Sequence, residues 1–144
     1  MATTPEAYVH LSTDKTTLTF YYDTLRADRN GETWGIREIR DRRISLLSSL
    51  PAWAGYRHSP STTVFTAVFD ASFHDFYPTT TAGWFYEFKS LKSIEGLEHL
   101  NTSQVTDMGG MFLGCESLAA LDLSSFDTSK VTDMGCMFYG CASL

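Results

Sequence analysis

The sequence has no apolar run long enough for a membrane-spanning helix: nowhere do eighteen apolar residues occur together. It begins MATTPEAYVHLS, with neither the cationic start nor the apolar stretch of a signal peptide. Two alternatives stay open: the protein remains in the cytoplasm, or its export signal lies outside this sequence. The chain stops at Leu144, in the middle of a repeat, so we expect a shortened chain and the second alternative.

Basic residues and cysteines are also few. Eleven Lys and Arg against seventeen Asp and Glu give a net charge of −6, which argues against a nucleic-acid partner. Three cysteines without a C-x-x-C spacing or a nearby histidine pair do not make a zinc site. The sequence also lacks G-x-S-x-G, H-E-x-x-H and a Gly-rich phosphate loop. We therefore expect no cofactor, no metal ion and no enzymatic activity.

What the chain does contain is a repeat in its last third. NTSQVTDMGGMFLGCESL, at 101–118, returns as DTSKVTDMGCMFYGCASL, at 127–144. A period of 26 residues is typical of stacked repeats, which are building units. Met108, Met111 and Phe112 stand at i, i+3 and i+4, a spacing that predicts one face of a short helix. Leu121 and Leu123 alternate with polar residues and predict a strand.

Other repeat residues fit the ends of that helix. Thr106 and Asp107, repeated as Thr132 and Asp133, stand where side-chain oxygens cap a first turn. Gly114 and Gly140 stand where a left-handed residue would end it. The two aspartates could alternatively be a calcium ladder, but the repeat lacks the dense Gly and Asp pattern of such loops. We therefore favour helix capping.

The pattern V-T-D-M-x-x-M-F-x-x-C-x-x-L, followed by L-D-L-S-x-F-D-T-S, resembles the repeats of the BspA-like leucine-rich-repeat surface proteins of bacteria. The resemblance implies a curved, non-enzymatic solenoid at the cell surface or secreted. It further implies an adhesion module that binds a host or partner protein or a glycan. The ligand varies within the family, so no individual binding residue follows from the resemblance.

The first half predicts a capping region for that solenoid. AYVHL and TLTFYYD, at 7–11 and 17–23, indicate a hairpin, followed at 24–35 by a loop or a second tight hairpin. Interleaved arginines and leucines in 37–50 favour an amphipathic helix over a strand, stopped by Pro51. We expect Trp53 to anchor that helix to the core. TVFTAVFD, at 63–70, predicts a strand that pairs with the hairpin.

The repeat begins in a degenerate form at Trp84, behind Thr79–Thr81, which can cap a short helix at 82–88. WFYEFKSL, at 84–91, lies 27 residues before MFLGCESL and matches it in Phe85, Ser90 and Leu91. The overall prediction is an α+β fold: an N-terminal α/β cap at 1–83 continuing into a leucine-rich-repeat solenoid at 84–144, with parallel strands and short helices.

The same alignment predicts the state of the thiols. Cys115 and Cys141 share a position that Phe88 fills in the first copy, which indicates apolar surroundings and buried, reduced thiols. Cys136 takes the place of Gly110 and should be exposed.

An alternative from another class is a hydrolase-type enzyme with its site in the N-terminal region, suggested by His74, Asp75 and the nearby Ser72. Sequence neighbours on an extended segment point to opposite faces, so this spacing does not support a triad.

The interaction module is favoured because the copies differ mainly at positions expected to be exposed: Thr102, Gln104 and Glu116, with Thr128, Lys130 and Ala142. The lower face of the last copy, with Met134, Met137 and Phe138, should lack a cover, which suggests self-association through that end.

Overall fold

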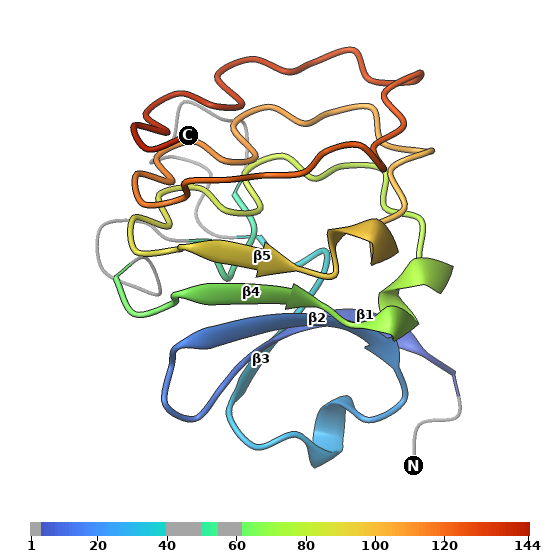
Figure 1. Cartoon of the computed structure of the whole chain (residues 1–144). Coiled ribbons are helices and arrows are strands. Elements are labelled where there is room, and N and C mark those ends of the chain that lie inside the picture. The colour runs from blue at the N-terminus through green and yellow to red at the C-terminus, as the bar shows by residue number, and fades with distance from the viewer. Residues whose placement is uncertain (1–3, 40–49, 55–61) are drawn as a thin grey trace.

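The computed structural model describes residues 4–39, 50–54 and 62–144. Its centre is a mixed sheet of five strands in the order β3-β1-β2-β4-β5. The strands are β1 (Glu6–Leu11), β2 (Thr17–Asp23), β3 (Glu32–Gly35), β4 (Thr66–Phe69) and β5 (Ser93–Glu95). Within these ranges, three short 3₁₀ helices accompany the strands: η1 (Arg26–Asp28), η3 (Ala71–Asp75) and η4 (Leu97–His99). In Figure 1 the hairpin lies at one end of the molecule and the C-terminal segments lie beyond β5 at the other.

The predicted hairpin is confirmed: β1 and β2 pair antiparallel, with Leu11 opposite Leu18. The Ser12 hydroxyl accepts the backbone amides of Thr16 and Thr17, at 3.2 and 3.0 Å, and so closes the turn. The segment after the hairpin is η1 followed by β3, and β3 pairs with β1 on the outer edge. It is therefore a third strand, and not a second tight hairpin.

The strand predicted at 63–70 is confirmed over β4, which pairs with β2 of the hairpin in parallel. β5 in turn pairs with β4 in parallel. Ala67 and Phe69 of β4 are buried, whereas Thr66 and Val68 are half-buried, as expected for a strand with one covered face. The predicted helix at 37–50 falls mainly on 40–49, outside the described residues.

The prediction of a helix-containing leucine-rich-repeat solenoid is wrong. Among the described residues there is a small mixed sheet and no α-helix. The helices expected at 82–88, at Met108–Phe112 and at the matching residues of the last copy are runs of tight turns. Leu121 and Leu123 lie outside any strand, so the parallel sheet ends at β5.

The predicted helix does not form because residues with a left-handed backbone conformation interrupt each copy. Gly110 and Gly114 have φ of 61° and 80°, and Cys136 and Gly140 repeat them at 56° and 78°. The Met111 amide donates to the Met108 carbonyl at 3.2 Å, which closes a turn whose third residue is Gly110. A positive φ at that place is typical of a type II turn and stops helical propagation. The 3–4 spacing of apolar residues thus arises from consecutive turns.

The strand predicted at Leu121 and Leu123 is absent for a different reason. β5 reaches only to Glu95, and Gly96 then adopts φ of 71° as the chain turns into η4. A cavity of about 240 Å³ lies between Ile94–Glu98 and Ala120–Ser125. The two segments are therefore separated where a sixth strand would have to pair.

Successive copies nevertheless lie on one another and exchange backbone hydrogen bonds. The Gly83 amide donates to the Gly109 carbonyl, and the Gly110 amide donates to the Gly135 carbonyl, at 3.0 and 2.9 Å. The turns of the three copies follow the same course in Figure 1. We call the copies layer 1 (77–91), layer 2 (101–118) and layer 3 (127–144).

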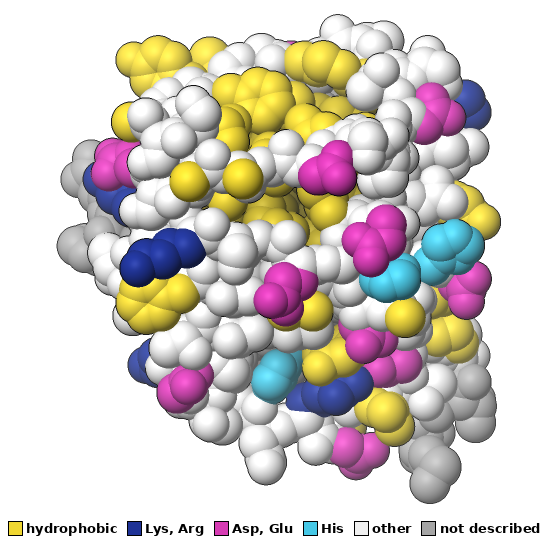
Figure 2. Space-filling model, in the orientation of Figure 1, with side chains coloured by type: hydrophobic (Ala, Val, Ile, Leu, Met, Phe, Trp, Pro, Cys, Tyr) yellow, Lys and Arg dark blue, Asp and Glu magenta, His cyan; other side chains and the backbone are white. Residues whose placement is uncertain are grey.

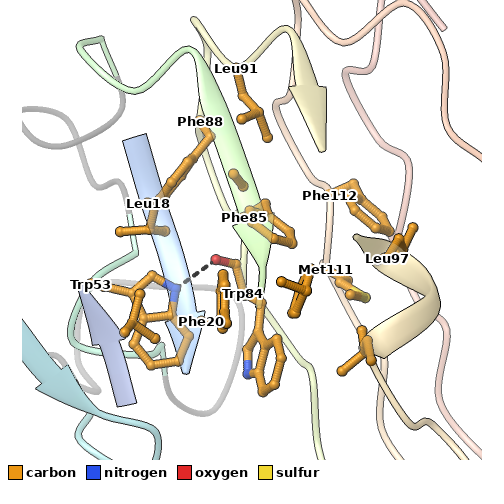
Figure 3. Packing of buried hydrophobic residues seen from close by; sticks show 14 of the residues in the cluster. Leu18, Phe20, Trp53, Trp84, Phe85, Phe88, Leu91, Leu97, Met111 and Phe112 are labelled. Carbon is orange, nitrogen blue, oxygen red and sulfur yellow. Dashed lines mark hydrogen bonds between the residues drawn. The ribbon is translucent and has the colours of Figure 1, made fainter. Parts of the chain in front are cut away.

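One hydrophobic cluster runs from β1 to Met137. Phe20 of β2 is at its crowded end, with the rings of Trp53, Phe69 and Trp84 all within 6 Å between centroids. The Trp53 indole N–H donates to the Trp84 carbonyl at 2.9 Å, as Figure 3 shows. Trp53 is thus anchored in the core, whereas most of the helix that it is predicted to hold there lies outside the described residues. The division of the chain at residue 83 stays a prediction.

Candidate functional site

The exposed side of the layers is the part of the molecule where the copies differ. Gln104, Glu116, Thr128, Lys130 and Ala142 are all exposed, as the sequence predicts. The Lys130 ammonium donates to the Gln104 side-chain oxygen at 2.8 Å, so equivalent positions of layers 2 and 3 are in direct contact. Substitutions at this repeat position therefore lie side by side on the surface of layers 2 and 3.

Thr102 is the exception, because it is buried. Its hydroxyl accepts the Asp127 amide at 2.7 Å and donates to the Asp127 carbonyl at 3.2 Å. It joins the start of one copy to the start of the next. The prediction of exposure was wrong because a hydroxyl with both bonds made inside the protein can be buried at little cost.

Tyr77 is a surface residue that the repeat alignment could have found. It stands 27 residues before Gln104, the same spacing that relates the first copy to the second. Its side chain is 53% exposed, whereas its neighbour Pro78 is buried like Val105 in layer 2. Tyr77, Gln104 and Lys130 are therefore three equivalent positions of different chemistry, and we call them the lateral column.

Asp107 and Asp133 close turns instead of capping helices. Each carboxylate accepts the backbone amide two residues later, from Gly109 or Gly135, at 2.8 Å. The capping prediction was right that these side-chain oxygens accept backbone amides, but wrong that the amides belong to a helix. Within the described ranges no group of three or more His, Cys, Asp or Glu side chains is close enough together to hold a metal ion.

Two of the cysteines lie where the alignment predicts, whereas Cys141, predicted to be buried, is less covered. Cys115 is buried and Cys136 is exposed, while Cys141 is intermediate. The Cys115 thiol donates to the Phe85 carbonyl and the Cys141 thiol donates to the Phe112 carbonyl, at 3.2 and 3.0 Å. Burial raises the pKa of both thiols above the ordinary value, so they stay protonated at neutral pH.

Ser72, His74 and Asp75 do not form a catalytic arrangement in the structure. The Ser72 hydroxyl accepts the Tyr22 amide at 3.1 Å, which ties η3 to β2. His74 and Asp75 are both exposed, and their nearest charged atoms are 3.7 Å apart. These positions give the hydrolase alternative no support.

A polar cluster on the hairpin was not predicted. The Tyr8 hydroxyl donates to Asp23 at 2.6 Å, and Arg29 donates to both, at 3.0 and 2.8 Å. The Arg29 guanidinium also lies 3.6 Å from the centroid of the Tyr21 ring. Burial and the bond to Asp23 raise the pKa of Tyr8 to about 12, although Arg29 opposes the shift. The cluster fastens the segment after β2 to the sheet.

Comparison with known proteins bears on the layered region. Among the described residues, no helix has the length and apolarity required to cross a membrane. Neither the curated proteins nor the solved structures contain a match. Residues 79–144, which start ahead of Trp84 and so include the degenerate first copy, are similar to the family described as "Mycoplasma protein of unknown function, DUF285".

Proposed function

We propose that the protein is a non-catalytic interaction module of a bacterial surface protein of the BspA-like type, and that it binds a partner protein or a glycan outside the cell. The similarity of residues 79–144 to the DUF285 family supports the surface-repeat assignment. The observation that carries the binding role is the lateral column, where three layers display Tyr77, Gln104 and Lys130 in turn.

The lateral column has the chemistry of a recognition surface. The exposed Tyr77 offers a flat apolar ring with a hydroxyl, and the Gln104 amide and the Lys130 ammonium offer hydrogen-bond donors. In layer 2 the neighbouring Val105 and Met108 are fully buried and belong to the core, apart from the exposed column. Variation at the column can therefore alter the ligand without altering the fold.

The test is binding of the whole chain to a panel of host-matrix proteins and glycans. We expect the combined variant Tyr77→Ala, Gln104→Ala, Lys130→Ala to lose binding. The control is Lys89→Ala with Glu116→Ala, another exposed pair one repeat apart. Loss of binding by the control alone, or equal binding by both variants, would refute the lateral column as the recognition surface. Hydrolase screening of the same protein, with turnover abolished by His74→Ala, would overturn the non-catalytic assignment.

A further inference from the structure

We propose that the cavity between β5 and residues 120–125, which we call the groove, is a second binding site. Its ligand is an extended basic segment of another protein, which is added as a strand beside β5. The groove lies between the segments that follow layers 1 and 2, apart from the lateral column. Its walls include Ile94, Leu97, Glu98, Leu121, Asp122 and Ser124.

The edge of β5 that faces the groove is open. On the other edge, the Ser93 amide donates to the Phe65 carbonyl, just before β4, at 3.3 Å. Alternate residues of a strand bond to opposite sides, so the amide and the carbonyl of Ile94 face the groove. Within the described ranges neither of these two groups has a hydrogen-bond partner, and no backbone bond joins β5 to 120–125. An extended chain can therefore pair with this edge.

The groove is a local gap, because layers 1 and 2 are bonded to each other directly before it. The Phe85 amide donates to the Met111 carbonyl and the Glu87 amide to the Leu113 carbonyl, at 2.8 and 2.7 Å. The volume of the groove is about 240 Å³. Pockets for drug-sized ligands have volumes of roughly 300–1,000 Å³. The groove therefore suits a short stretch of extended chain better than such a ligand.

The apolar side chains of the groove favour alternating residues in the ligand. Leu97 is only 6% exposed, and Ile94 and Leu121 are half-buried. Figure 2, in the orientation of Figure 1, shows hydrophobic side chains in a hollow above β5, with Asp and Glu side chains around it. Apolar residues on one face of an added strand would cover Ile94 and Leu121, and would leave the other face for charged residues.

The charges of the groove select a basic ligand. Glu98 and Asp122 are both exposed, and neither forms an ion pair with a Lys or Arg of the described residues. The Asp122 carboxylate accepts the Ser124 amide at 2.9 Å. Hydrogen bonds from Ser124 lower the pKa of Asp122, so this carboxylate is charged at neutral pH. Lysine or arginine on the added strand would supply the missing counter-charges.

The probe is a capped peptide in which lysine alternates with valine, added to the whole chain. We expect saturable binding and slower hydrogen exchange at the Ile94 amide. Exchange at the Phe85 amide, which is already bonded, should not change. A peptide with glutamate in place of lysine should not bind, because its charge has the sign of the groove. The lysine peptide with N-methylated backbone amides should not bind either, since it has no amide to donate to the Ile94 carbonyl.

Two double variants separate the groove from the general acidity of this half of the chain. Glu98→Gln with Asp122→Asn should weaken binding of the lysine peptide roughly tenfold, through the loss of two ion pairs. The control is Glu116→Gln with Asp127→Asn, which removes two other exposed carboxylates and should leave binding unchanged. The control is matched because Asp127 accepts the amide two residues later at 2.9 Å, as Asp122 does.

The proposal is overturned if the two double variants bind the lysine peptide alike, or if the glutamate or the N-methylated peptide binds equally. It is also overturned if exchange at the Ile94 amide is not slowed, since charge alone would then hold the peptide. The combined variant Tyr77→Ala, Gln104→Ala, Lys130→Ala should bind the lysine peptide as the wild type does. Loss of binding in that variant would place the peptide on the lateral column and refute the groove.

Discussion

At the residue scale, the three thiols differ in how accessible they are. Cys115 is buried with a raised pKa, Cys136 is exposed, and Cys141 is intermediate. Since the thiolate is the reactive form, we expect a maleimide to label Cys136 fastest in the native protein, Cys141 more slowly and Cys115 last. Mass spectrometry of timed digests measures the order. Rapid labelling of Cys115 at the rate of Cys136 would contradict the buried position.

Phe112 and Phe138 allow a matched comparison, because they are the same residue in equivalent positions. Phe112 is fully buried between the rings of Phe85 and Phe138, whereas Phe138 is 43% exposed. Phe112→Ala should lower the free energy of unfolding by about 3–5 kcal/mol through the cavity it leaves. Phe138→Ala should cost clearly less. Urea unfolding of the two variants measures both losses, and equal losses would contradict the exposed position of Phe138.

At the scale of the element, the hairpin owes part of its stability to Asp23. Burial alone would raise the pKa of this carboxyl, but hydrogen bonds from Tyr8, the Leu25 amide and Arg29 hold it below its usual value. A lowered folded pKa means that the contribution is present above the unfolded value of 3.8 and is lost as pH falls through the folded pKa. We expect the stability advantage of the wild type over Asp23→Asn to shrink below about pH 4. An advantage that is constant from pH 7 to pH 3 would argue against this role.

The elements also show what the sequence could predict. The hairpin and β4 have strict alternation and β-forming residues, so local pattern and final structure agree. The helix prediction for the repeat was wrong because apolar residues at i, i+3 and i+4 fit a helix and a run of tight turns equally well. The deciding feature was the left-handed backbone at Gly110 and at Gly114. Both glycines are visible in the sequence, but a left-handed conformation that ends a helix was predicted only for Gly114, and not for Gly110.

Surface residues were harder to predict than the core. Phe85, Phe112 and Phe138 were aligned correctly and do stack. Thr102 was wrongly predicted to be exposed, because its hydrogen-bond partner, Asp127, comes from the neighbouring copy. The cluster around Arg29 was missed because its members lie on separate segments that only the fold brings together. A periodic pattern gives the positions of apolar residues, whereas polar partners depend on the tertiary arrangement.

At the scale of the whole molecule, the sheet and the layers share one core. Phe20 of β2 contacts Trp84 and Phe85 of layer 1, and Trp53 bonds to the Trp84 carbonyl. We therefore expect the N-terminal region and layers 1 and 2 to unfold together. Tryptophan fluorescence and far-ultraviolet circular dichroism should give coincident transitions in urea. Two separated transitions would instead support independent units divided near residue 83.

The order of the layers has a consequence for biosynthesis. β4 adds to the hairpin, β5 adds to β4, and each copy is placed on the copy before it. The ribosome releases the chain in the same order, so each new segment meets a surface that is already folded. Chains arrested on the ribosome with Leu118 released should therefore resist a pulse of protease. Chains arrested with only the hairpin and β3 released should be cut, because Phe20 would still lack Phe69 and Trp84 as neighbours.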